Sequence, residues 1–177
     1  MRKRASLPFS STPAPRPSSL RTFDTPFGRI TLLATAKGLR RVVLPGVGEA
    51  LHATGGEDRQ AEAHAAQAER EIREYLDGRR REFTVPLDMD DLPPFYAKVL
   101  RQLLKVPCGQ TVSYGELACR AGSPKAARAV GQAMAANPIP IVIPCHRVLA
   151  SGHRLGGYGG GPDLKRRLLT LEGVAVR

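Results

Sequence analysis

The spacing of hydrophobic residues changes along the chain, and each spacing predicts a type of element. Residues 30–35 and 39–44 are rich in β-branched and aliphatic side chains and are joined by a lysine-glycine turn signal, which predicts two paired strands. Between residues 60 and 77, alanines and larger apolar residues recur at helical spacing among charged ones, which predicts a helix that ends at Gly78. A further segment, residues 83–87, predicts another short strand.

Two segments of unusual composition divide the chain. Residues 1–20 are rich in proline, serine and threonine and hold few large apolar groups, so we expect a disordered tail there. Residues 88–94 are acidic and end in two prolines, which is typical of a domain boundary. We therefore expect an N-terminal α/β domain over residues 21–91 and a second domain over residues 92–177.

The second half predicts several short helices. Residues 94–105 carry one apolar helical face. Ser113, followed three residues later by Glu116, matches a capping box and predicts the start of the next helix. Ser123 and the proline after it predict the start of a helix of small residues over 125–136. Two short helices joined by a tight glycine turn resemble a helix-turn-helix, although many helical hairpins bind nothing.

Composition and charge narrow the function classes. The chain has 177 residues, of which 42% are hydrophobic and 24% charged, as in globular proteins. It has no apolar run long enough for a membrane helix, and no apolar stretch follows the basic N-terminus, so we expect neither a membrane span nor a secretory signal. Most of the net charge of +11 lies in residues 92–177, which hold 12 basic and 3 acidic residues. This asymmetry favours a polyanionic partner, most simply nucleic acid, over a protein merely kept soluble by its charge.

The cysteines supply the candidate chemistry. Cys108, Cys119 and Cys145 form no CxxC pair, so we expect neither a disulfide framework nor a structural zinc site, and we expect a reducing cytoplasm as the location. Cys145 precedes His146 and follows an apolar run, residues 139–143, that predicts a buried strand. A thiol beside a base is a candidate nucleophile, because the thiolate is the reactive form. From this dipeptide alone, a buried and inert cysteine stays an open interpretation.

Five short motifs together resemble one family. They are SYGELA at residues 113–118, AARAV at 126–130, NP at 137–138, PCHRV at 144–148 and LEG at 171–173. In this order and spacing they resemble the O6-alkylguanine-DNA alkyltransferases, also called methylated-DNA–protein-cysteine methyltransferases, over roughly residues 94–173. The first half is similar to that family only loosely.

The resemblance implies an α/β (α+β) fold and an activity. A small ribonuclease-H-like α/β domain would precede a mainly helical, winged-helix-like domain with a helix-turn-helix. The protein would be a monomer that repairs double-stranded DNA, bound through the minor groove, without a cofactor or a metal. The alkyl group of O6-alkylguanine would pass irreversibly to Cys145, with O4-alkylthymine as a second candidate substrate. Some members bind zinc in the N-terminal domain, but residues 1–91 contain no cysteine.

The resemblance also implies catalytic roles. Cys145 would attack the alkyl carbon, His146 would take the thiol proton through a water, and Glu172 would orient His146. Asn137 would hold the turn before the active-site strand. Tyr114 would hydrogen-bond the departing guanine and crowd the phosphate of the flipped nucleotide.

For DNA, the resemblance implies that the target base leaves the duplex and that Arg128 fills the vacated position. Small residues beside Arg128 would let its helix approach the sugar-phosphate backbone: Ala127, Ala129 and Gly131. Ser123 and Ser151 would donate to phosphates.

The implied pocket is lined by Met134 and Val148, whose carbonyl would read the guanine amino group. Its mobile wall would be the glycine-rich stretch that holds Gly157, Tyr158 and Gly159, which does not fit the GxGxxG dinucleotide pattern. Gly159 stands where many members carry a serine. We expect a roomier wall that tolerates alkyl groups larger than methyl.

Three alternatives stay open at this point. A non-catalytic binder of alkylated DNA would lack the active cysteine. A helix-turn-helix regulator would keep its cysteine for structure and prefer a base sequence, and a thiol hydrolase would turn over ester or amide substrates.

Overall fold

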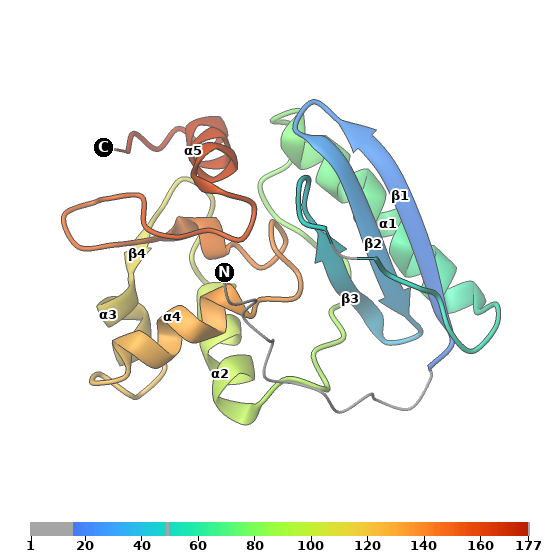
Figure 1. Cartoon of the computed structure of the whole chain (residues 1–177), viewed down its shortest axis with the longest axis horizontal. Coiled ribbons are helices and arrows are strands. Elements are labelled where there is room, and N and C mark those ends of the chain that lie inside the picture. The colour runs from blue at the N-terminus through green and yellow to red at the C-terminus, as the bar shows by residue number, and fades with distance from the viewer. Residues whose placement is uncertain (1–15, 49, 177) are drawn as a thin grey trace, which may run out of the picture.

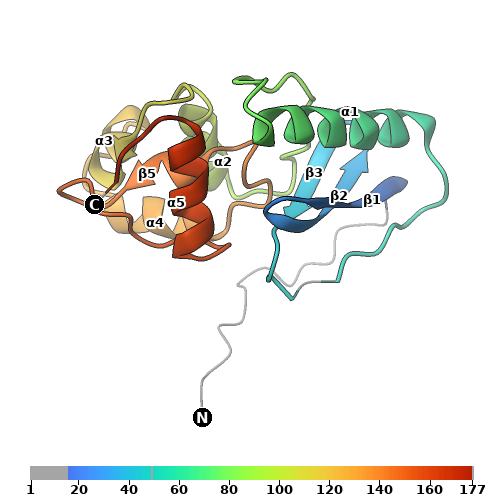
Figure 2. The same ribbon diagram turned by 90° about the horizontal axis from the view of Figure 1, so that it is seen from above.

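The N-terminal half is a three-stranded antiparallel sheet covered on one face by a long helix. A computed structural model describes residues 16–48 and 50–176. Strands β1 (Ser18–Thr25), β2 (Gly28–Thr35) and β3 (Gly38–Val43) pair in the order β1-β2-β3. Helix α1 (Arg59–Leu76) packs against all three strands (Figures 1 and 2). The predicted strand pair and helix are therefore confirmed, each within about two residues.

Helix α1 forms for reasons that are visible in its sequence. Asp58 caps its start by accepting a hydrogen bond from the backbone N–H of Ala61. Its buried face includes three alanines as well as Ile72 and Tyr75, which are 0% and 1% exposed. Gly78 follows with a φ of 75°, the left-handed conformation that ends helices. The end of α1 that carries Tyr75 points toward the C-terminal half (Figure 2).

Two predictions for this half are corrected. Strand β1 begins at Ser18, inside the segment expected to be a tail, because this segment pairs with β2; residues 1–15 lie outside the described residues. Residues 83–87 form no strand and share a single bridge with β3. Their backbone N–H groups at Thr84 and Val85 donate instead to the carboxylate of Glu71, at 2.9 and 3.1 Å.

The C-terminal half is mainly helical. It contains α2 (Pro94–Leu103), β4 (Val112–Ser113), α3 (Tyr114–Arg120), α4 (Ala127–Ala135), the 3₁₀ helix η1 (Cys145–Arg147), β5 (Val148–Leu149) and α5 (Pro162–Leu171). The short strands β4 and β5 pair in parallel. This pairing fixes the start of α3 beside the segment that follows Cys145. Backbone hydrogen bonds therefore hold Tyr114 and Cys145 in the same part of the domain.

The predicted start of the first helix of the helix-turn-helix, α3, is confirmed, but the second helix, α4, starts later than predicted. Ser113 and Glu116 make both bonds of the predicted capping box. Ser123 caps no helix: its carbonyl closes a turn with the N–H of Ala126 at 2.9 Å, and α4 begins only at Ala127. The serine-proline signal therefore marks a turn between the two helices.

Residues 139–143 form a buried turn, so the predicted strand is wrong. The N–H of Ile143 donates to the carbonyl of Ile139 at 2.9 Å, and Ile141 has a φ of 73°. Two nearby prolines, Pro138 and Pro140, remove donors that a sheet would need. A run of apolar residues indicates that the segment is buried, but a buried turn and a buried strand fit it equally well.

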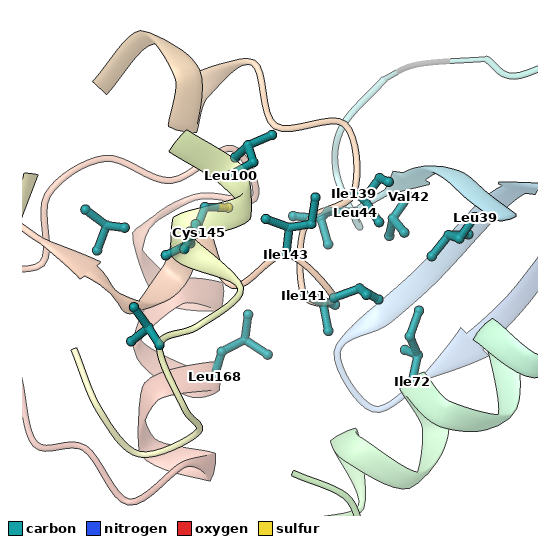
Figure 3. Close-up of a cluster of buried hydrophobic side chains, with 14 of the residues drawn as sticks. Leu39, Val42, Leu44, Ile72, Leu100, Ile139, Ile141, Ile143, Cys145 and Leu168 are labelled. Carbon is teal, nitrogen blue, oxygen red and sulfur yellow. The ribbon is translucent and has the colours of Figure 1, made fainter. Parts of the chain in front are cut away.

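One hydrophobic core joins the two halves. Figure 3 shows Val42 and Ile72 of the N-terminal half opposite Ile139 and Ile141, and the same cluster includes Cys145. The N–H of Val42 also donates to the carbonyl of Pro138 at 2.9 Å. The N-terminal sheet therefore buttresses the turn that leads to Cys145. No helix in the described ranges, 16–48 and 50–176, is both long and apolar enough to cross a membrane.

Candidate active site

Cys145 begins the 3₁₀ helix η1 and is 7% exposed. Its backbone N–H donates to the carbonyl of Ile143 at 2.8 Å, which closes the buried turn. Asn137 fastens the same turn from both ends: its Nδ2 donates to the Ile143 carbonyl and its Oδ1 accepts from the Ile139 N–H, both at 3.0 Å. The position of the thiol is thus fixed by a side chain eight places earlier in the sequence.

His146 and Glu172 meet inside the protein, where both side chains are fully buried. Nε2 of His146 lies 2.8 Å from Oε1 of Glu172, the residue that caps the end of α5. Nδ1 of His146 is also buried and has no hydrogen-bond partner among the described residues. A proton on Nε2 satisfies Glu172, so Nδ1 keeps its lone pair and can accept a proton.

Arg147 and the backbone hold Glu172 in its charged form. Nε of Arg147 donates to Oε2 of Glu172 at 2.9 Å, and Nη2 donates to Oε1 at 2.8 Å. The N–H of Gly109 adds a donor to Oε2 at 3.2 Å. Burial alone would raise the pKa of Glu172, but the donors from His146 and Arg147 outweigh it and hold that pKa well below its usual range.

The protonation states of Cys145 and His146 favour a thiol and a neutral base. Burial raises the pKa of Cys145 to about 11, although the Asn137 side chain and the charge of Lys165 act in the opposite direction. Burial lowers the pKa of His146, with the Glu172 hydrogen bond opposing it. Cys145 is therefore a thiol before it reacts, and a base has to remove its proton as the reaction proceeds.

Cys108 lies close to the same carboxylate, which sequence spacing did not suggest. It is half-buried, and burial together with the Glu172 charge raises the pKa of its thiol. Cys108 does not line the cavity onto which Cys145 opens, so it is not placed to compete with Cys145 for a substrate bound there. Within the part of the chain that the structure describes, no group of three His, Cys, Asp or Glu side chains could hold a metal ion.

A cavity of about 250 Å³ opens onto Cys145. Its lining comes from four segments: Tyr114, Gly131, Met134, Ala135, Cys145, Gly157, Tyr158 and Gly159. The hydroxyl of Tyr158 is buried without a partner among the described residues. All but one of the residues predicted to line the pocket therefore lie at this cavity, and Tyr114 and Cys145 line it as well.

The exception is Val148. It is fully buried, it does not line the cavity, and its carbonyl accepts a hydrogen bond from Nζ of Lys165 at 2.7 Å. Burial lowers the pKa of Lys165 to about 8. Lys165 was not predicted, because among its basic neighbours in α5 nothing marks it as buried.

A second cavity of about 200 Å³ adjoins the first between α4 and the N-terminal sheet. Both cavities include Met134, Cys145, Tyr158 and Gly159, and the second continues past Pro140 to the end of β3. Gly159 has open space where a Cβ would be, so the wall beside Cys145 is bare of side chains at this position.

The residues predicted to contact DNA lie mainly on α4. Arg128 is exposed near its start, and Ala127, Ala129 and Gly131 are half-exposed beside it. A Cβ at Gly131 would meet the ring of Tyr114 at 3.9 Å, so α4 and α3 approach closely here. Their small side chains leave Arg128 as the projecting group.

The two serines lie away from α4 itself. Ser123 lies in the turn before the helix, and Ser151 is exposed in the loop after β5. Neither is placed at a helix start, so the structure gives no helix-terminal phosphate site at Ser123.

Comparison with known proteins covers both halves of the chain. The family model for the ribonuclease-like domain of 6-O-methylguanine DNA methyltransferase matches residues 20–89, and that for the DNA-binding domain of the same family matches residues 94–174. The methylated-DNA--protein-cysteine methyltransferase of Mycobacterium tuberculosis is 40% identical over 153 residues, which is 86% of this chain and 90% of the relative. The protein of that name from Methanosarcina acetivorans is 37% identical over 151 residues, 85% of this chain and 96% of the relative.

A solved structure is similar over the same extent. The crystal structure of Mycobacterium tuberculosis OGT in complex with DNA superposes with a TM-score of 0.77 at 39% sequence identity. The match covers 86% of this chain and 91% of that one.

Proposed function

Because this chain belongs to the 6-O-methylguanine DNA methyltransferase family, we propose that it repairs DNA by moving the alkyl group of O6-alkylguanine onto its own Cys145. The observation that carries this proposal is a cysteine at the floor of a cavity, next to a histidine with a free, buried Nδ1. That histidine is oriented by a buried carboxylate. The order nucleophile, base and orienting acid is that of a catalytic triad.

The proposed step is a direct displacement at the alkyl carbon. The bond from guanine O6 to the alkyl carbon breaks as the bond from the Cys145 sulfur forms, and the thiol proton passes to Nδ1 of His146, through a water where the two do not touch. Tyr114, which lines the cavity, donates a hydrogen bond to the guanine as it leaves with the electron pair. Glu172 stabilises the imidazolium that results.

DNA is the partner that the charge and shape of α4 suit. A guanine inside a duplex hides its O6, so the target nucleotide has to rotate into the cavity. We propose that Arg128, which is exposed on α4, enters the minor groove and fills the gap, with Ala127 and Ala129 allowing close approach. Ser123 and Ser151 are candidate phosphate donors from the loops on either side.

The remaining assignments also belong to this proposal. We assign residues 21–91 to the N-terminal domain and residues 92–177 to the domain that binds DNA and accepts the alkyl group. We also propose that the protein acts as a monomer. We also propose a cytoplasmic location. All three cysteines are free, and a reducing compartment keeps an acceptor thiol in that state.

Replacing Arg128 by alanine tests the DNA part of the proposal. The change should lower the rate of repair of duplex DNA by roughly 100-fold. Rotating a base out of the duplex costs a few kcal/mol of unstacking and unpairing energy, which the inserted arginine side chain helps to offset. Reaction with free O6-benzylguanine, which needs no base flipping, should change by less than about threefold. Single-turnover rates with both substrates are the measurement.

Arg59→Ala is the matched control, since it removes an exposed arginine from the N-terminal half. Both of its rates should equal those of the unmodified chain. Equal losses on both substrates in Arg128→Ala would show that Arg128 serves only the fold. Strong preference for one base sequence in unmodified DNA would instead favour a regulator.

A further inference from the structure

One residue of the N-terminal half reaches into the active site. Tyr75, in the last turn of α1, is 1% exposed and lies in the part of that helix nearest the C-terminal half (Figure 2). Its ring packs against Phe83, with 5.4 Å between ring centroids. Its hydroxyl extends beyond this packing to the buried pair of His146 and Glu172.

The hydroxyl of Tyr75 bonds both members of that pair. It donates to Oε1 of Glu172 at 2.6 Å, across 97 residues of sequence, and lies 3.2 Å from Nε2 of His146. Since Nε2 is itself 2.8 Å from the same Oε1, the three atoms form a closed triangle. The phenolic proton points to Glu172, so the phenolic oxygen can accept from the Nε2–H of His146.

Tyr75 keeps its proton in this triangle. Burial and the neighbouring Glu172 charge raise the pKa of Tyr75 far above its usual value, so its proton stays in place. A hydrogen bond from a hydroxyl to a carboxylate is short and strong. Gly109 donates to Oε2 of Glu172, whereas Tyr75 meets the carboxylate at Oε1, the oxygen that contacts His146 and also accepts from Nη2 of Arg147.

We propose that Tyr75 is a positioning residue for alkyl transfer: its hydroxyl fixes Oε1 of Glu172 and the Nε2–H form of His146, so that Nδ1 faces the reacting thiol as the base. The N-terminal domain then contributes a group to the active-site hydrogen-bond network. This inference rests on the function proposed above, in which His146 takes the proton of Cys145. A phenol in a dry site also supplies the polar contact that water gives to an exposed histidine–carboxylate pair.

The test is Tyr75→Phe in the full-length chain, because phenylalanine keeps the ring and removes only the oxygen. Single-turnover transfer is measured at increasing concentrations of O6-methylguanine duplex, which separates the maximal transfer rate from the apparent Kd for DNA. We expect the maximal rate to fall roughly 10-fold, since a shift of well under 1 Å should cost less than the ~100-fold of a 1 Å misplacement. The apparent Kd should stay within twofold of the unmodified chain.

Two variants separate positioning from packing. Tyr96→Phe removes a hydroxyl from a half-buried tyrosine in α2 and should leave the transfer rate unchanged. Phe83→Leu loosens the packing around Tyr75 but keeps its hydroxyl, so it should lower the melting temperature while keeping the transfer rate within about twofold. Loss of transfer in Phe83→Leu equal to that in Tyr75→Phe would overturn the proposal.

A double-mutant cycle with Glu172→Gln shows whether Tyr75 acts through Glu172. In that background the carboxylate is gone, so Tyr75→Phe should change the remaining rate by less than about twofold. An equal factor in both backgrounds, or a Tyr75→Phe rate equal to that of the unmodified chain, would contradict the proposal. Failure of the function itself is distinct, because the unmodified chain would then show no transfer to Cys145.

Discussion

Cys145→Ser is expected to lower alkyl transfer below detection, since loss of the nucleophile in a triad costs about a million-fold. A serine hydroxyl is far less acidic than a thiol, and neutral His146 cannot compensate for the difference. Serine is close to cysteine in size, so the buried turn should persist with a loss of about 1 kcal/mol in the free energy of unfolding. Transfer of a labelled methyl group from duplex DNA and a thermal melt measure the two effects.

Cys119→Ser and Cys108→Ser are the controls for that variant. Cys119 is exposed, so its replacement should leave transfer unchanged. Cys108 lies beside Glu172 but does not line the cavity, so its replacement should leave transfer to Cys145 in place. An inactive Cys108→Ser variant together with an active Cys145→Ser variant would show that Cys145 is not the nucleophile.

Glu172→Gln is expected to lower the transfer rate roughly 10³- to 10⁴-fold, as loss of the orienting acid does in a triad. The glutamine keeps an oxygen for hydrogen bonding but cannot stabilise the imidazolium. It also leaves Arg147 buried without its counter-ion, which should cost about 3 kcal/mol of the free energy of unfolding. Single-turnover transfer and urea unfolding measure the two losses.

The pH dependence of stability gives this prediction a second measurement. The pKa of Glu172 is lowered on folding from a reference value of 4.5, so its contribution is fully present above that pH and is lost as the pH falls toward the folded pKa. The difference in melting temperature between the unmodified chain and Glu172→Gln should therefore narrow below about pH 4.5. Glu57→Gln, which changes an exposed glutamate, should show no such trend. A constant difference down to low pH would show that the charge of Glu172 does not stabilise the fold.

Elements with local signals could be predicted from the sequence. The capping box at Ser113 and Glu116 closes within one helical turn, and both of its bonds form as the motif indicates. Helix α1 likewise follows its alanine spacing and stops at Gly78. These signals lie within a few residues of what they determine, so folding of the rest of the chain does not change them.

Two other elements could not be predicted from the apolar pattern. The apolar run of residues 139–143 is compatible with any buried conformation, and Asn137 together with two prolines makes it a turn. Residues 83–87 lose their strand pairing because Glu71 takes two of their backbone donors. The two prolines are a local signal against a strand, whereas the contact with Glu71 has no signature in the sequence of residues 83–87.

The candidate site divides along the same line. Cys145 and His146 are adjacent in the sequence and form a recognisable motif. Tyr75 contributes through a bond to a residue 97 places away, and Lys165 is a lysine whose burial only the fold reveals. Both residues reach the site through contacts with residues far away in the sequence, and such contacts cannot be predicted from the spacing of residues along the chain.

The most direct test of the account is the number of transfers that each chain performs. A thioether on Cys145 has no good leaving group, so water should not regenerate the thiol. With O6-methylguanine duplex in excess, intact mass over time should reach a plateau at one added methyl group per chain, located in the peptide that contains Cys145, with one guanine restored for each. Continued repair beyond one event per chain, or repair with an unmodified chain, would contradict transfer to Cys145.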